Sequence, residues 1–223
     1  MSEAKVWHEV DDYISSQLLP QDLVMEAVLA ANRSAGLPAI DVSPNQGMLL
    51  HIWAKMGKAK RILELGTLGG YSTIWMARAL PKDGKLVTIE MDPAHAKVAQ
   101  SNFALAGVEG LIELRAGEAL TQLEQLDTEG TEPFDLIFID ADKPNNPAYL
   151  IWALRFSQPG TVIIGDNVVR DGAIIQGDSV DPRVQGIRRF YEGIAAEPRL
   201  TATAIQTVGS KGYDGFMIGI VDG

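Results

Sequence analysis

The chain of 223 residues contains no cysteine. Disulfides, thiolate metal sites and a cysteine nucleophile are therefore excluded, and a reducing cytoplasm is the location we expect. Basic residues are also few, since 19 Lys and Arg stand against 29 Asp and Glu, which gives a net charge of −10. Because binding to a nucleic-acid backbone requires clustered Lys and Arg, this balance argues against a nucleic-acid partner.

Long apolar runs are missing as well. No segment is apolar enough to span a bilayer, and the first residues form an amphipathic pattern rather than a secretory leader, so no membrane partner is expected. A composition of 46% hydrophobic and 22% charged residues is typical of a globular protein. We expect one domain over residues 1–223, with a helical cover at 1–58 and an α/β core at 59–223.

Apolar residues recur at helical spacing before any strong strand signal appears, at 5–18, 21–35 and 44–57. Ser43 and Pro44 are typical of an N-cap and a first helical turn, so the third helix should begin there. From residue 61 onward, β-rich runs alternate with helical stretches, which predicts a Rossmann-like α/β fold with a mostly parallel sheet and helices on both faces. Strands are expected at 61–65, 86–90, 111–114, 134–139 and 161–165, and helices near 70–80, 94–106, 117–126, 146–156 and 183–195.

The end of the chain follows a different pattern. Residues 200–207 and 215–221 both resemble strands, and no helical segment separates them. Two strands joined without a crossover helix pair antiparallel, so we expect a hairpin at one edge of the sheet. The total is then seven strands.

Two of the predicted strands end in hard oxygen ligands. The run FDLIFIDADK carries Asp140, and the run ending GDN carries Asp166 and Asn167. The carboxyl ends of strands in an open α/β sheet face a shared crevice, so these three side chains should converge there. Carboxylate and amide oxygens favour magnesium, with manganese or calcium as the other choices. Lys143 follows closely enough to remove a proton from a group held at this site.

A glycine-rich turn follows the first strand, in the segment ILELGTLGGYS. Glycines allow a ligand to approach the backbone closely. The spacing differs from the Gly-x-Gly-x-x-Gly of dinucleotide sites, and Glu64 precedes Gly66. An acid there would repel a pyrophosphate but suits an ammonium or sulfonium group, while Glu90 at the next strand end can accept ribose hydroxyls. This pattern favours S-adenosylmethionine over NAD.

The ordered set ILELGTLGGYS, LVTIEMDP, FDLIFIDADK, GTVIIGDNVVRDG and YDGF resembles the cation-dependent O-methyltransferases, the family of catechol and caffeoyl-CoA O-methyltransferases. The resemblance implies a seven-stranded sheet with an antiparallel final hairpin, and commonly a homodimer. It implies a metal site at Asp140, Asp166 and Asn167, with Lys143 as the catalytic lysine. The implied S-adenosylmethionine contacts are Val42, Glu64, Gly66, Thr67, Ser72, Glu90, Ala119 and Asp140.

The chemistry that these residues would support is direct methyl transfer to a metal-chelated vicinal diol, most simply a catechol or related phenolic molecule. Lys143 would accept the proton of the attacking hydroxyl, and alignment of donor and acceptor would supply most of the rate. Catechol-specific members carry an acid shortly before the final strand, and Thr207, Val208 and Gly209 offer none. This departure leaves room for larger phenolic acceptors.

Two other function classes remain open from the sequence. A methyltransferase that modifies a hydroxylated uridine in RNA could use the same site, although the acidic chain disfavours it. An NAD-type oxidoreductase or a non-catalytic nucleotide-binding module would need only the glycine turn, and the acid before that turn argues against both.

Overall fold

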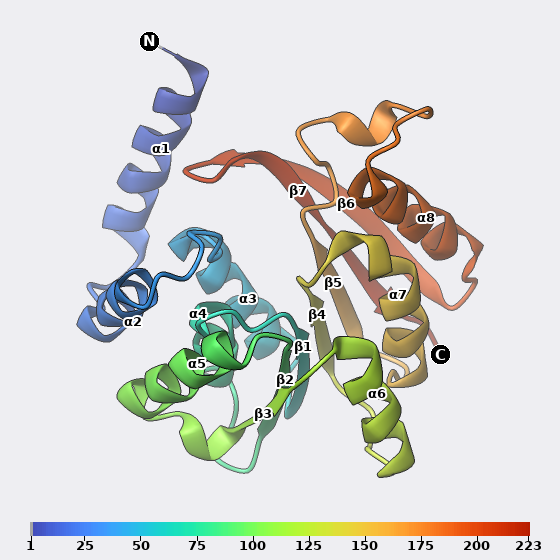
Figure 1. Ribbon diagram of the computed structural model, residues 1–223, viewed down its shortest axis with the longest axis horizontal. Coiled ribbons are helices and arrows are strands. Elements are labelled where there is room, and N and C mark those ends of the chain that lie inside the picture. Colours follow the sequence, from blue (N-terminus) through green and yellow to red (C-terminus); the bar gives the residue numbers. More distant parts are fainter. Residues whose placement is uncertain (1) are drawn as a thin grey trace.

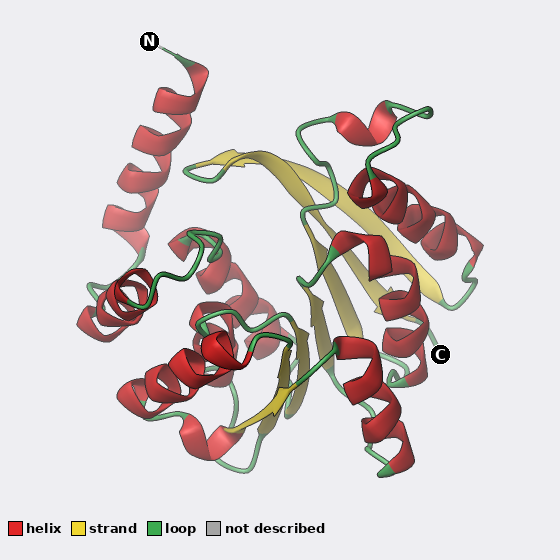
Figure 2. Ribbon diagram, viewed as in Figure 1, coloured by secondary structure: helices red, strands yellow, loops and turns green. Residues whose placement is uncertain are grey.

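The computed structural model describes residues 2–223, and within them the chain forms a seven-stranded sheet in the order β3-β2-β1-β4-β5-β7-β6, with helices around it (Figures 1 and 2). Strands β1 to β5 pair in parallel, whereas β7 is antiparallel to both β5 and β6. The predicted mostly parallel sheet with an antiparallel final hairpin is therefore confirmed. The strands are β1 Arg61–Leu65, β2 Lys85–Glu90, β3 Ile112–Ala116, β4 Leu136–Ile139, β5 Val162–Asp166, β6 Leu200–Gly209 and β7 Gly212–Val221.

The helices divide into two layers around the sheet (Figure 1). Their bounds are α1 Glu3–Leu18, α2 Leu23–Ser34, α3 Pro44–Met56, α4 Tyr71–Ala77, α5 Pro93–Ala106, α6 Ala119–Thr128, α7 Asn146–Arg155 and α8 Pro182–Ala196, with a short 3-10 turn η2 at Lys143–Asn145. One apolar cluster joins the sheet to α2, α3, α4 and α5, and the other joins it to α6, α7 and α8. Helix α1 lies at the periphery and has no buried residue, but Asp11 on it accepts the N–H of Ser210 in the hairpin turn at 2.7 Å.

Alternate residues of the central strands supply the two layers. In β1, Ile62 belongs to the cluster under α2 to α5, whereas Leu63 and Leu65 belong to the cluster under α6 to α8. In a strand, successive side chains point to opposite faces, so a central strand covered on both sides must be apolar at nearly every position. Glu64 is the exception in β1, and its burial requires partners.

Some element boundaries differ from those expected. Strand β4 begins at Leu136 rather than at residue 134, although the backbone of Asp135 still bonds both neighbouring strands. Its N–H donates to the Arg61 carbonyl at 2.8 Å, and its carbonyl accepts the Val162 N–H at 2.9 Å. Its Oδ2 accepts hydrogen bonds from the backbone N–H groups of Lys60 and Arg61, at 2.7 and 2.9 Å. The hairpin strands are longer than predicted and leave only Ser210 and Lys211 as the turn. No helix among residues 2–223 is long and apolar enough to cross a membrane.

Helix α8 packs tightly against the turn that carries Lys143, and Gly186 makes this possible. A Cβ at Gly186 would lie 2.1 Å from the carbonyl oxygen of Lys143. Gly186→Ala should therefore lower the free energy of unfolding by about 1–3 kcal/mol through overpacking. Urea denaturation of the variant and the wild-type protein measures this loss.

Gly193 on the same helix provides the matched control. A Cβ there would meet only the end of the Leu150 side chain, at 3.0 Å, and that side chain can move. Gly193→Ala should leave the stability unchanged or raise it by up to about 1 kcal/mol, because alanine favours the helix. Equal losses in both variants would show that close packing on Lys143 is not the cause.

Candidate active site at the carboxyl edge of the sheet

The polar residues predicted from the sequence lie at one edge of the sheet, where the strand order reverses between β1 and β4. Glu64 lies near the end of β1, Glu90 ends β2, Asp140 directly follows β4, and Asp166 ends β5. The backbone N–H of Asp140 donates to the Leu65 carbonyl at 2.9 Å, which places the two strand ends side by side. Ligands of open α/β sheets bind at such a switch point.

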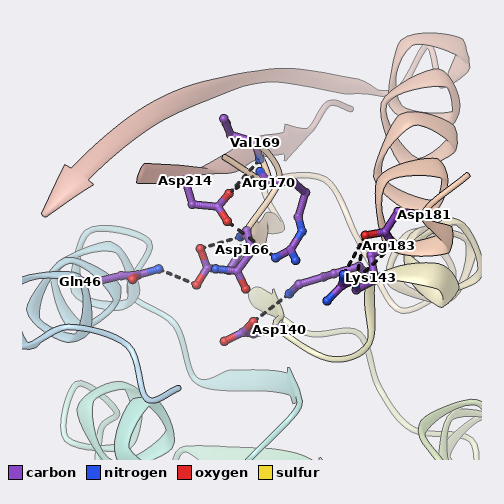
Figure 3. Close-up of polar contacts among 10 residues, drawn as sticks. Gln46, Asp140, Lys143, Asp166, Val169, Arg170, Asp181, Arg183 and Asp214 are labelled. Carbon is purple, nitrogen blue, oxygen red and sulfur yellow. Dashed lines mark hydrogen bonds and ion pairs between the residues drawn. The ribbon is translucent and has the colours of Figure 1, made fainter. Parts of the chain in front are cut away.

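Two carboxylates and a lysine meet at this edge (Figure 3). Lys143 Nζ donates to Asp140 Oδ1 at 2.9 Å, and the lysine is only 8% exposed. Asp166 is 6% exposed, and its two oxygens accept hydrogen bonds from different parts of the chain. Oδ1 accepts from the Asn167 N–H, and Oδ2 accepts from Gln46 Nε2 on α3, both at 2.8 Å.

The electrostatics of this group favour a cation. Burial, followed by the nearby negative charge of Asp140, raises the pKa of the Asp166 carboxyl well above its usual range. A positive charge between the two carboxylates would relieve both effects. The donor set of two carboxylates and the Asn167 amide suits a hard divalent ion. In the part of the chain that the structure describes, no group of three or more His, Cys, Asp or Glu side chains is placed to hold a metal ion by itself. The residues therefore fit a magnesium-type site of mixed carboxylate and amide ligands.

The glycine turn lies against Asp140, one of the predicted metal ligands. Gly66 has φ +96°, and a Cβ there would lie 2.4 Å from the carbonyl oxygen of Asp140. Glu90 Oε2 accepts the N–H groups of Thr67 and Leu68, at 3.2 and 2.7 Å, so the acid at the end of β2 holds the turn in place. Because residue 66 has no side chain, the backbone of the turn can pack directly against the end of β4.

Glu64 is fully buried within a network of hydroxyl groups. Its carboxylate accepts hydrogen bonds from Ser72 and Thr73, both at 2.5 Å, and from Thr88 at 2.7 Å. Burial is the largest influence and raises the pKa of Glu64 to about 7, while the three hydroxyls act in the opposite direction. Ser72, a predicted cofactor contact, is therefore linked directly to Glu64.

A second network fixes the other side of the turn and was not expected from the sequence. Asn32 on α2 is buried, and a Cβ at Gly69 would lie 2.0 Å from its Oδ1. Asn102 Nδ2 donates to Asn32 Oδ1 at 2.9 Å and to the Gly69 carbonyl at 2.8 Å. Asn32 Nδ2 also donates to Asp41 Oδ1 at 2.8 Å, next to the predicted cofactor contact Val42. The cover and the glycine turn are thus one hydrogen-bonded unit.

A cavity of about 300 Å³ opens beside Asp166 and Asn167. Its walls come from α1, the start of α3, the loop after β5 and the β6–β7 hairpin. It extends from Asp166 and Asn167 to the hairpin turn, which no sequence motif indicated. The residues around it are Asp11, Ser43, Asn45, Gln46, Leu49, Asp166, Asn167, Asp171, Thr207, Val208, Gly209, Lys211, Gly212, Tyr213, Asp214, Gly215 and Phe216.

The structure thus brings most of the predicted residues together. Lys143 is hydrogen-bonded to Asp140, and Gly66 packs against the Asp140 carbonyl. Val42 is buried just before α3, and Ala119 is the first residue of α6. Sequence reasoning missed Gln46, which donates to Asp166, and Asp214, which accepts hydrogen bonds from the backbone of the loop after β5. Only the YDGF motif carried a signal for Asp214.

Comparisons with known proteins bear directly on this arrangement. A family model described as O-methyltransferase matches residues 14–215. The chain belongs to this O-methyltransferase family. It is 53% identical over 220 residues to a catechol O-methyltransferase of Niastella koreensis, covering 97% of this chain and 98% of the relative. It is 46% identical over 213 residues to a catechol O-methyltransferase of Mycobacterium tuberculosis, covering 96% and 95%.

Solved structures agree with the family assignment. The O-methyltransferase from Bacillus cereus in complex with SAH has a TM-score of 0.97 and 57% identity, covering 98% of this chain and all of that one (100%). The O-methyltransferase TomG from Streptomyces achromogenes, in complex with SAM, has a TM-score of 0.96 and 51% identity, with 100% of both chains covered. The resemblance found in the sequence is therefore confirmed, and the alternative of an NAD-type oxidoreductase is not supported.

Burial of Glu64 predicts a specific pH dependence of stability. Its folded-state pKa of about 7 lies above the ordinary 4.5, so the folded protein retains a proton that the unfolded chain releases. The contribution to stability is full below the unfolded pKa and is lost as the pH rises through the folded pKa. The free energy of unfolding should fall between pH 5 and pH 8, and Glu64→Gln should make the fall smaller.

Urea denaturation at several pH values tests this expectation, with Glu124→Gln on the exposed side of α6 as the matched control. The control should follow the wild-type curve. A Glu64→Gln curve parallel to the wild-type one would show that this carboxyl does not titrate on unfolding.

Proposed function

We propose that the protein transfers a methyl group from S-adenosylmethionine to a hydroxyl of a catechol-like small molecule, with the help of a divalent cation. The observation that carries the proposal is the meeting of Asp140, Lys143 and Asp166 beside the glycine turn. Membership of the O-methyltransferase family supports the reaction class. The catechol O-methyltransferase names of two close relatives support the acceptor class.

The methyl donor would bind over the glycine turn. Relatives at 57% and 51% identity have been solved with SAH and SAM. We assign donor contacts to the residues around the turn, where the backbone can be approached closely. They are Val42, Glu64, Gly66, Thr67, Ser72, Glu90, Ala119 and Asp140. Glu90 Oε2 accepts two backbone N–H groups, and Oε1 accepts the Asp92 N–H at 2.9 Å. The carboxylate is therefore held in place, and Oε1 keeps one further accepting position that a ribose hydroxyl could use.

Asp140, Asp166 and Asn167 would hold the cation, which we propose to be magnesium, with manganese or calcium as substitutes. When bound, such an ion lowers the pKa of a hydroxyl that it coordinates. The protein supplies the rest of the site. Gln46 and the Asn167 N–H occupy oxygens of Asp166 and orient its carboxylate, and burial excludes competing water.

Lys143 would act as the general base. Its amine lies within hydrogen-bond distance of Asp140 and is almost enclosed, so it is held in the site, where it could reach an acceptor oxygen bound to the cation. Helix α8 fixes its backbone through Gly186. Position and orientation of this kind are what general base catalysis requires.

The cavity indicates an acceptor larger than a bare catechol. It extends from Asp166 to the hairpin turn, and Thr207, Val208 and Gly209 contribute to its wall without an acid. Leu49 and Phe216 supply apolar surface on which an aromatic ring can pack. We therefore propose a phenolic acceptor that carries a substituent beyond its diol ring.

The whole chain would act as one catalytic domain, because Gln46 in the helical cover at 1–58 donates a hydrogen bond to Asp166, a proposed metal ligand.

We further propose a homodimer. Helix α1 has no buried residue and exposes apolar side chains at Val6, Val10, Tyr13 and Leu18, which a second copy could cover. A cytoplasmic location stays a prediction from the sequence.

Removal of a metal ligand should abolish the cation-stimulated reaction. Asp166→Ala should lower kcat with a dihydroxylated phenolic acceptor at least about 100-fold, because the cation can no longer orient and acidify the hydroxyl. Binding of S-adenosylmethionine, followed by calorimetry, should change little. Asp127→Ala, at an exposed ion pair with Arg155, is the control and should keep full activity. Equal wild-type activity with and without a chelator would contradict the cation's role.

Replacement of the base should affect the chemical step alone. Lys143→Met should lower kcat by roughly 10²–10⁴-fold, the usual contribution of general base catalysis. Lys143→Arg should be nearly as slow, because guanidinium does not lose its proton in proteins. Steady-state kinetics with labelled methyl donor measures both. An Arg variant with wild-type kcat would show that charge, not proton transfer, is the contribution of Lys143.

A further inference from the structure

The loop after β5 adopts a backbone conformation that its residues do not favour. Asn167, Arg170 and Asp171 have positive φ angles of 53°, 55° and 52°. None of them is glycine. Asn and Asp reach this region more readily than other residues, but Arg170 does so at a steric cost, so the surroundings must hold the loop. The first of the three is also one of the proposed metal ligands. Whatever holds the loop therefore also fixes that ligand.

The side chain that holds the loop is Asp214 on β7 (Figure 3). Its Oδ1 accepts hydrogen bonds from the backbone N–H groups of Val169 and Arg170, at 2.9 and 3.0 Å. The neighbouring carbonyl of Gly215 accepts the N–H of Val168 at 3.0 Å. Three successive loop N–H groups are thus bound to two successive residues of one strand.

The guanidinium of Arg170 contributes little to this attachment. Its Nη1 lies 3.8 Å from Asp214 Oδ2, and its Nε is buried without a hydrogen-bond partner. Charge pairing at this distance, between partly exposed groups, is weak. The two backbone hydrogen bonds at Oδ1 are therefore the stronger link between Asp214 and the loop.

The same strand segment also faces the acceptor. Asp214, Gly215 and Phe216 line the cavity, and Phe216 is the register partner of Asp166 across the β5–β7 pair. Asp214 thus lies two residues from the position directly opposite a metal ligand. A shift of the Asp214 carboxylate would move the loop after β5, which carries Asn167, relative to the cavity wall.

We propose that Asp214 is a positioning residue for the reaction, which sets the orientation of the Asp166–Asn167 pair relative to the acceptor cavity. The inference rests on the proposed cation-dependent function. Asp214 acts through the loop backbone and touches no reacting atom. Its role depends on the hydrogen-bond-accepting oxygen rather than on its negative charge.

Binding of Mn²⁺, measured by electron paramagnetic resonance on the full chain with SAH present, tests the role without any turnover. Asp214→Ala should weaken Mn²⁺ binding by about 10–100-fold, the usual effect of losing a group that orients metal ligands. Asp214→Asn should stay within about threefold of wild type, because its amide oxygen keeps both hydrogen bonds. Loss of the same size in both variants, or in neither, would overturn the proposal.

Asp222→Ala is the matched control. Asp222 also lies at the hairpin and accepts a hydrogen bond, from Thr201 Oγ1 at 2.7 Å, but near the opposite end of the two strands. It should bind Mn²⁺ like the wild type. If it weakens binding as much as Asp214→Ala, general damage to the hairpin is the cause and the positioning role is wrong.

The ratio of the two monomethylated products from a 3,4-dihydroxy phenolic acceptor gives a second readout. Asp214→Ala should change this ratio, because the cation would no longer be held at a fixed position relative to the cavity wall. Asp214→Asn should preserve the ratio. A wild-type protein that binds Mn²⁺ normally but transfers no methyl group would contradict the proposed function and leave the binding test intact. An unchanged ratio and unchanged binding in Asp214→Ala would contradict only the role of Asp214.

Discussion

Repulsion between a buried carboxylate and a partly exposed one beside it is the constraint on which the site depends. Asp140 and Asp166 come from neighbouring strand ends, and the second is held almost out of solvent. A protein does not keep two such groups together without compensation, since burial alone disfavours each charge. Lys143 provides part of the compensation through its hydrogen bond to Asp140. A divalent cation would provide the remainder, which links the electrostatics of the fold to the chemistry that we propose.

The surrounding structure orients this charged group from three directions. Gln46 reaches Asp166 from the cover, Gly186 brings α8 against the Lys143 backbone, and Asp214 holds the loop that follows β5. On the fourth side the glycine turn packs against Asp140. This is possible because residue 66 has no side chain that would clash with the Asp140 carbonyl. Each contact joins segments that are far apart in the sequence. Rigid support of this kind is what a site needs in order to align two substrates.

The sequence predicted the parts of the fold that depend on local patterns. Apolar runs marked the parallel strands, and Ser43 marked the start of α3, where its Oγ accepts the Gln46 N–H at 3.2 Å. Residues at strand ends were also predictable, because parallel strands bring their carboxyl ends to one edge. The hairpin was placed correctly but too short, since Gly209 and Asp214, which are uncommon in strands, interrupt the strand pattern.

The parts that sequence patterns missed are long-range polar contacts. Nothing in the residues around Gln46 or Asn32 marks them as partners of Asp166 and Asn102, because these contacts exist only after the chain has folded. Glu64 was predicted as a donor contact through its charge, but the three hydroxyls that satisfy this buried acid were not predicted. A burial pattern can show that an acid lies inside, but not which groups satisfy it.

The most direct test is a crystal structure of the protein with Mn²⁺, SAH and a catechol-type ligand, in which anomalous scattering locates the metal. The account predicts one ion bound by the side chains of Asp140, Asp166 and Asn167, with both ligand oxygens on it and Lys143 Nζ beside one of them. An ion bound elsewhere, or none at these three residues in crystals that contain SAH, would contradict it.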